Sequence, residues 1–123
     1  MADFRNLAVW QHSHRFSLDC YKATSTWPSQ EQFGLTSQVR RAAVSVGAII
    51  AEGSGRGTDR DFTRFLRIAL GSANELESLL LVAECLGYLS PDSHVNLHRS
   101  NREIRKMLTG LIKTLGRLIR QNP

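Results

Sequence analysis

The sequence predicts an all-α fold, an antiparallel up-and-down four-helix bundle. Three observations support this prediction. Apolar residues recur at steps of three and four along four long segments, no segment alternates apolar and polar residues over a useful length, and the connections between segments are short. We expect helices over residues 7–26, 30–53, 59–86 and 91–119, in a single domain spanning residues 1–123.

The first predicted helix ends at Trp27-Pro28, because proline disfavours helical backbone in the residue before it. Its inner face is expected to pass through Leu7, Trp10, His14, Ser17, Tyr21 and Thr24, and Phe16, Leu18 and Cys20 are expected to widen the buried arc. Ser29 and Gln32 have the spacing of a capping box, which predicts that the second helix begins there. The inner face of that helix is mostly small, and we expect Gly47 to lack a side chain because close packing requires it.

Glycine, proline and capping residues separate the remaining helices. The second helix is expected to end at three glycines, Gly53, Gly55 and Gly57. Thr58 and Asp61 then have the spacing that opens a helix. Leu86-Gly87 predicts a C-terminal cap with glycine in the left-handed region, and Ser90-Pro91 predicts the start of the fourth helix.

Composition indicates a basic protein. The chain has a formal net charge of +5, and arginine dominates, since Lys22, Lys106 and Lys113 are the only lysines. This balance favours an acidic partner such as nucleic acid, although the charge alone also serves solubility. Cys20 and Cys85 are isolated and are expected to be small core residues of a reduced protein. We see no signal peptide and no membrane span, so we expect a cytoplasmic protein.

Arginines are the candidate nucleic-acid contacts. Arg60, Arg64 and Arg67 follow steps of four and three and therefore share one face of the third helix. The full candidate set is Arg40, Arg41, Arg56, Arg60, Arg64 and Arg67. A second basic stretch on the fourth helix contains Arg99, Arg102, Arg105 and Lys106. Base stacking on these arginines is not predicted, and a merely solvated charged face is the alternative.

Three glutamates are candidates for ion pairs. We expect Glu52, Glu75 and Glu77 to pair with arginines such as Arg56, either buried within the bundle or between subunits. Glu75 and Glu77 are two residues apart and do not face each other, which argues against paired acid–base catalysis. Serine, histidine and aspartate have no triad spacing, and we predict no catalytic residue.

Two further patterns resemble ligand sites but do not complete a motif. The loop Gly53–Gly57 precedes a helix and could hold a phosphate at free amides, yet it follows a helix instead of a strand and lacks the P-loop lysine. We favour a tight turn. His94 and His98 have the spacing of two zinc ligands, but the glutamate of the H-E-x-x-H motif is missing. We therefore predict no metal and no cofactor.

Six segments carry a family resemblance: Leu7–Gln11, Phe33–Val46, Ile50–Arg56, Phe62–Leu66, Ile68–Glu77 and Leu86–Leu89. In these segments the chain resembles the four-helix-bundle proteins related to those encoded by 23S rRNA intervening sequences, the S23-type proteins. The resemblance implies a homopentamer with no established enzymatic activity. A similar accessory protein of diversity-generating retroelements is basic and binds nucleic acid. One departure is Gly47-Ala48-Ile49, where the family often has proline and asparagine.

The sequence therefore leads to two functional hypotheses. The first is a non-enzymatic oligomeric bundle, by resemblance a pentamer, that binds RNA or DNA through its arginines. The second is a structural or assembly protein whose arginines form salt bridges between subunits and have no nucleic-acid role.

Overall fold

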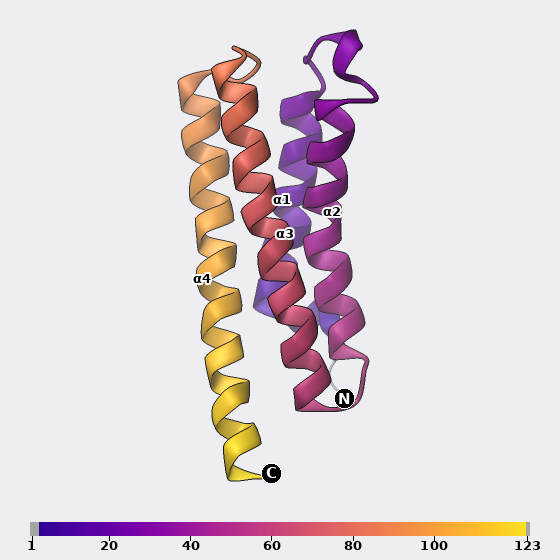
Figure 1. Cartoon of the computed structure of the whole chain (residues 1–123), viewed down its shortest axis with the longest axis vertical. Coiled ribbons are helices and arrows are strands. Elements are labelled where there is room, and N and C mark those ends of the chain that lie inside the picture. Colours follow the sequence, from indigo (N-terminus) through magenta and orange to yellow (C-terminus); the bar gives the residue numbers. More distant parts are fainter. Residues whose placement is uncertain (1–2, 123) are drawn as a thin grey trace.

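The structure, a computed structural model that describes residues 3–122, is a bundle of four long α-helices (Figure 1). The helices are α1 (Ala8–Thr24), α2 (Leu35–Ser54), α3 (Asp59–Cys85) and α4 (Pro91–Gln121). Two short 3-10 helices, η1 (Phe4–Asn6) and η2 (Ser29–Glu31), precede α1 and α2. No strand occurs among residues 3–122, and the all-α prediction is confirmed. Met1, Ala2 and Pro123, which the predicted domain includes, lie outside the described residues.

Each helix packs against two neighbours. α1 contacts α2 and α4, while α3 contacts α2 and α4, so the helices follow one another around the bundle. α4 is the longest at 31 residues, about 46 Å at the usual helical rise, and its C-terminal end extends beyond the connection between α2 and α3 (Figure 1). Within the described residues α4 contacts only α1 and α3, so no other helix covers its outer side.

The core contains leucine, isoleucine, alanine and valine from all four helices. Its largest fully buried apolar side chains are Ile50, Leu66, Leu76, Leu80, Ile104 and Leu108. Within the described chain, no helix combines the length and hydropathy that a membrane crossing needs. Cys20 is buried as expected, and burial raises the pKa of its thiol to about 12. Cys85 is exposed, so the prediction that it is a core residue is wrong.

The inner face of α1 differs from the prediction. Phe16, Ser17, Cys20 and Thr24 are buried as predicted, but Val9 and Ser13 are buried as well, and His14, Leu18 and Tyr21 are exposed. The small polar residues can lie inside because their hydroxyls donate to carbonyls of the same helix. Ser13 Oγ donates to Val9 O at 2.8 Å, and Thr24 Oγ1 donates to Cys20 O at 2.9 Å. Burial therefore costs these hydroxyls no hydrogen bond.

The start of α2 also differs from the prediction. Ser29 begins η2 instead of capping α2, and α2 starts five residues after the predicted position, at Leu35. Glu31 provides the missing cap, since its Oε1 accepts a hydrogen bond from Leu35 N at 3.2 Å. Its Oε2 accepts one from Tyr88 Oη at 2.9 Å, which raises the pKa of Tyr88. The cap of α2 is thus connected to Tyr88, a residue distant in the sequence.

The other predicted caps are confirmed. Thr58 Oγ1 accepts from Asp61 N at 3.2 Å, and Ser90 Oγ accepts from Ser93 N at 3.2 Å. Gly87 has a φ of 79°, and the next residue, Tyr88, donates its N–H back to Ala83 O at 2.9 Å. This arrangement is the Schellman motif.

Two glycines of α2 have opposite packing roles. α2 ends at Ser54 with Gly55 as its C-terminal cap, so the helix ends among the predicted glycines, one residue beyond Gly53. A Cβ at Gly53 would lie 2.5 Å from Phe65 Cβ, so the close approach of α2 and α3 requires glycine there. A Cβ at Gly47 would lie 3.6 Å from Trp10 Nε1, an ordinary contact. The prediction that close packing requires Gly47 is therefore wrong.

Candidate nucleic-acid interface

Two of the predicted nucleic-acid contacts are arginines of α2, and their surroundings differ. Arg40 Nε donates to Thr24 Oγ1 at 2.8 Å, and its guanidinium lies 4.6 Å from the ring centroid of Tyr21. Arg40 therefore joins α2 to α1. Arg41 is exposed and lines a hollow of about 350 Å³ together with Glu75. Neither residue is near α4, because α2 and α4 make no contact within the described chain.

The arginines at the start of α3 surround an acid and an aromatic ring. Asp61 lies 3.9 Å from Arg56 Nε and 3.6 Å from Arg64 Nε. The guanidiniums of Arg56 and Arg64 also lie 5.2 and 4.7 Å from the ring centroid of Phe65. Arg56 Nη1 is 4.0 Å from Glu52 as well. We call Arg56, Arg64, Asp61 and Phe65 the Asp61 cluster. In this cluster, positive charge is partly compensated inside the chain.

The same cluster affects the glycine loop before α3. Asp59 and Asp61 lie in the first turn of α3, where their negative charges complement the helix dipole. A phosphate at these amides would meet two carboxylates. The loop therefore works as a turn, with Gly57 at a φ of 95°.

A row of cations follows the outer side of α4. It consists of Arg99, Arg102, Lys106, Lys113, Arg117 and Arg120, and all six are exposed. We call it the α4 stripe. Its steps of three, four and seven residues keep these side chains on one face of the helix. At 1.5 Å per residue, the stripe is about 32 Å long. Lys113, Arg117 and Arg120 were absent from the predicted basic stretch, although the same spacing rule finds them.

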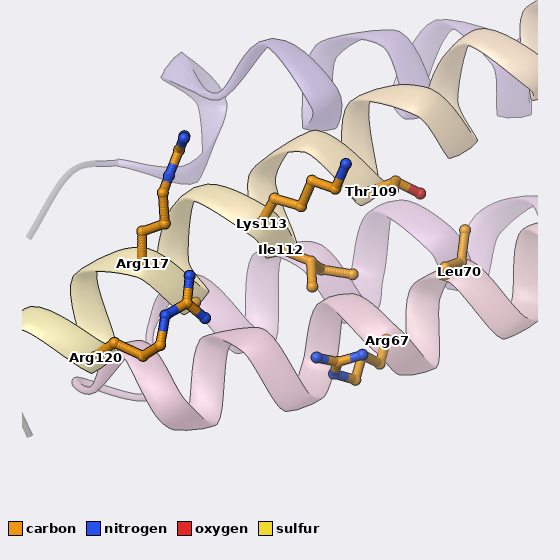
Figure 2. A pocket seen from close by; sticks show the side chains of 8 residues that line it. Arg67, Leu70, Thr109, Ile112, Lys113, Arg117 and Arg120 are labelled. Atoms are coloured by element: carbon orange, nitrogen blue, oxygen red, sulfur yellow. The ribbon is translucent and has the colours of Figure 1, made fainter.

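Arg67 lies across a hollow from the C-terminal half of the α4 stripe, and this hollow is formed between α3 and α4 (Figure 2). Arg67 extends from α3, and Lys113, Arg117 and Arg120 extend from α4. The hollow has a volume of about 520 Å³, and Leu70, Thr109, Ile112 and Gly116 complete its lining. No acidic residue lines it. Of the six predicted arginines, Arg67 lies beside the stripe, and Arg60 is exposed seven residues before it on the same face of α3.

A second hollow continues along the same groove. It has a volume of about 620 Å³ and is lined by Leu70, Asn74, Arg102, Arg105, Lys106, Thr109, Gly110 and Lys113. This lining again contains no carboxylate. At the far end of the stripe the charge is mixed, because Arg99 lines a hollow toward α1 together with Glu103. The free positive charge is therefore concentrated in the middle and C-terminal parts of α4.

The predicted glutamates have different surroundings. Glu77 binds within the chain, 2.8 Å from Arg105 Nη1 and 3.1 Å from His98 Nδ1. Glu75 is exposed, and Glu52 pairs loosely with Arg56. Both histidines of the pair contact carboxylates, because His94 Nδ1 contacts Glu84 just as His98 contacts Glu77. Among residues 3–122, no three histidine, cysteine or acidic residues are grouped in a way that could hold a metal ion.

The family model for the 23S rRNA-intervening sequence proteins matches residues 5–110. The chain belongs to this family. A crystal structure of a protein of unknown function from the S23 ribosomal protein family of Bacteroides thetaiotaomicron is similar, with a TM-score of 0.78 and 29% sequence identity. The similarity covers 86% of this chain and 99% of the other. No curated protein matches the chain.

Family membership confirms the resemblance on which the sequence analysis relied, and the four helices agree with it. The match to the 23S rRNA-intervening sequence family ends at residue 110. Lys113, Arg117 and Arg120 follow that point. Three of the six cations of the α4 stripe thus lie beyond the matched region.

Proposed function

We propose that this protein is a non-enzymatic nucleic-acid-binding bundle that contacts the phosphate backbone through the α4 stripe and Arg67. One observation carries the proposal. Arg67, Lys113, Arg117 and Arg120 surround one hollow whose lining contains no carboxylate (Figure 2). Uncompensated arginines and lysines in a row are suited to phosphates, because each one that neutralises a phosphate releases bound counterions.

The other predicted arginines have lesser roles in this proposal. Arg60 is exposed on α3, on the same face as Arg67, and adds positive charge two turns farther along that helix. Arg40, Arg56 and Arg64 are held by groups within the chain, at the distances given above. To contact a phosphate, these arginines would have to leave their partners, and the free energy lost would offset part of the binding free energy gained.

The test of this proposal is binding to a mixed pool of RNA and DNA fragments at two salt concentrations. We expect clear binding at about 50 mM salt and a loss of at least a hundredfold at about 200 mM, because the contacts are electrostatic. Affinity that is undetectable at low salt, or that does not change with salt, would reject the proposal.

We also propose that the protein is a homo-oligomer, with the pentamer that the resemblance implies as the expected state. Apolar side chains on the outer side of α2 and α3 support this proposal. Val44, Ile68 and Val82 are 46%, 47% and 45% exposed. A second copy would cover these side chains. Native mass spectrometry should give five chains per particle, and a monomer would rule the assembly out.

The alternative is an assembly role without nucleic acid, in which arginines pair with Glu52, Glu75 or Glu77 of a neighbouring subunit. Glu77 already has two partners in its own chain, which disfavours it. Glu75 favours the alternative, because it is exposed and has no ion pair within residues 3–122. In that case, Arg56→Ala or Arg64→Ala should dissociate the particle in sizing experiments. An intact particle would argue against those two pairs.

A further inference from the structure

We infer that the α4 stripe fits the backbone of a double helix and not a single strand, and that Gly110 and Gly116 let this backbone approach α4. The inference rests on the proposed function, but it makes a separate claim about the form of the nucleic acid. It depends on three features of the groove: the residues that line it, its straightness and its glycines.

The groove offers no surface for base stacking. Neither of the two hollows along α3 and α4 has a phenylalanine, tyrosine or tryptophan in its lining. The large exposed aromatic side chains lie elsewhere: Tyr21 is on α1 beneath Arg40, and Phe33 is in the connection before α2. Sites for single strands combine cations with aromatic rings on which successive bases stack. Here only the cations are present, so unpaired bases find no aromatic ring on which to stack.

The stripe is straight and rigid. All six cations belong to one uninterrupted helix, and they extend along about 32 Å. A double helix is also rigid at this length, and it presents about one phosphate charge per 1.7 Å. Either partner must order the long cationic side chains, but a flexible strand must also be straightened along the helix, which a duplex avoids. The geometry therefore favours the duplex.

Two glycines of α4 have no role inside the chain. A Cβ at Gly110 would meet no atom within 4 Å, and a Cβ at Gly116 would meet only Arg120 Nη1 at 3.6 Å. Neither glycine has a positive φ. Glycine weakens a helix interior relative to alanine, so some benefit is expected outside internal packing.

The position of the glycines suggests that benefit. Gly110 and Gly116 lie three residues before and after Lys113, and each lines one of the two hollows. Their missing side chains lower the surface of α4 on both sides of a cation. A sugar–phosphate backbone can then approach the helix closely enough for Lys113 and Arg117 to reach phosphates directly.

The first test compares duplexes with single strands on the full-length protein. Fluorescence anisotropy would use a labelled duplex of roughly 20 base pairs, longer than the stripe, and each of its strands alone, in RNA and DNA versions at one salt concentration. We expect the duplexes to bind at least tenfold more tightly than their strands. We also expect the RNA and DNA duplexes to agree within about fivefold, because phosphates are the contacts.

The outcomes separate this inference from the proposed function. Equal or tighter binding of the single strands would overturn the duplex inference and leave nucleic-acid binding intact. A hundredfold preference for one kind of duplex would overturn contact through the backbone alone. Absence of binding by every probe would overturn the proposed function itself.

The second test adds bulk at the open glycine. Gly110→Leu should weaken duplex binding at least fivefold and leave the salt dependence unchanged, because every cation remains. The matched control is Ala48→Leu, which adds similar bulk at an exposed site of α2. It should not change the affinity. Thermal melts would show that Gly110→Leu folds, with a melting temperature no lower than wild type. Unchanged duplex affinity in a folded Gly110→Leu protein would overturn the role of this glycine.

Discussion

The Asp61 cluster and the α4 stripe are both rich in arginine, but their surroundings differ. In the Asp61 cluster, Arg56 and Arg64 lie 3.9 and 3.6 Å from one carboxylate and close to the ring of Phe65. Along the middle and C-terminal parts of the stripe, the residues that line the hollows include no acid. The number of arginines in a region therefore does not locate a binding surface. The groups that surround each guanidinium decide whether its charge is available.

The sequence itself contains the origin of this difference. The first turn of α3 has acidic residues because they complement the dipole at the start of a helix. No aspartate or glutamate follows Glu103, whereas Arg105, Lys106, Lys113, Arg117 and Arg120 all do. Cations are favourable near the end of a helix, so α4 tolerates this run of positive charge.

The largest predicted effect concerns the glycine that supports the Asp61 cluster. Gly53→Ala should reduce the free energy of unfolding by about 1–3 kcal/mol, because the new Cβ would overlap Phe65 and force α2 and α3 apart. Chemical denaturation measures this change. Gly47→Ala is the matched control on the same helix. It should be neutral or stabilising by up to about 1 kcal/mol. Equal losses in both variants would show that the contact with Phe65 is not the cause.

Replacing Gly110, beside the α4 stripe, should stabilise the protein, in contrast to replacing Gly53. Gly110→Ala should increase the free energy of unfolding by about 1 kcal/mol, because alanine is the better helix former and its Cβ meets no other atom. The same denaturation experiment tests this expectation. A destabilised Gly110→Ala protein would mean that the open space beside α4 is filled in solution.

Removing the acid of the Asp61 cluster should make the two regions more alike. Asp61→Asn releases Arg56 and Arg64 from their carboxylate, so we expect nucleic-acid affinity to rise by about threefold to tenfold at low salt. Glu31→Gln, far from both regions in the loop before α2, removes one negative charge without releasing an arginine of the cluster. Its affinity should increase less. Similar increases in both variants would indicate that net charge alone controls binding.

The smallest effect is expected from one arginine of the cluster. Arg56→Gln should lower the free energy of unfolding by no more than about 1 kcal/mol, because its ion pairs are about half exposed. Its nucleic-acid affinity should stay within about twofold of wild type, since the side chain is already engaged. Denaturation and binding curves on one preparation would measure both. A large loss of affinity with normal stability would place Arg56 in the interface.

Local signals predicted much of the fold. Thr58, Ser90 and Gly87 are capping residues whose roles depend on neighbours within a few positions, and all three were predicted correctly. The start of α2 was not, because Glu31 caps it while bound to Tyr88, a residue 57 positions away. The inner face of α1 was partly misplaced for a local reason, since the carbonyl of Val9 binds the hydroxyl of Ser13 and makes this residue suitable for burial.

The candidate site was predictable only in part. Spacing alone indicated charged faces on the third and fourth helices, and it could also have extended the fourth to Lys113, Arg117 and Arg120. Spacing could not indicate that Arg40 of α2 binds Thr24 of the neighbouring helix α1. Nor could it indicate that Arg67 faces the end of α4 across a hollow. Both facts depend on which helices are neighbours, so they required the structure.

The most direct test of the account is the salt dependence of nucleic-acid binding in two triple variants. One replaces Lys113, Arg117 and Arg120 of the stripe with glutamine, and the other replaces Arg40, Arg56 and Arg64, which are held within the chain. Plots of the logarithm of the binding constant against that of salt concentration give the number of phosphates contacted. We predict that the first variant loses about three contacts, whereas the second loses fewer than one. The reverse order, or equal losses, would contradict the assignment of binding to α4.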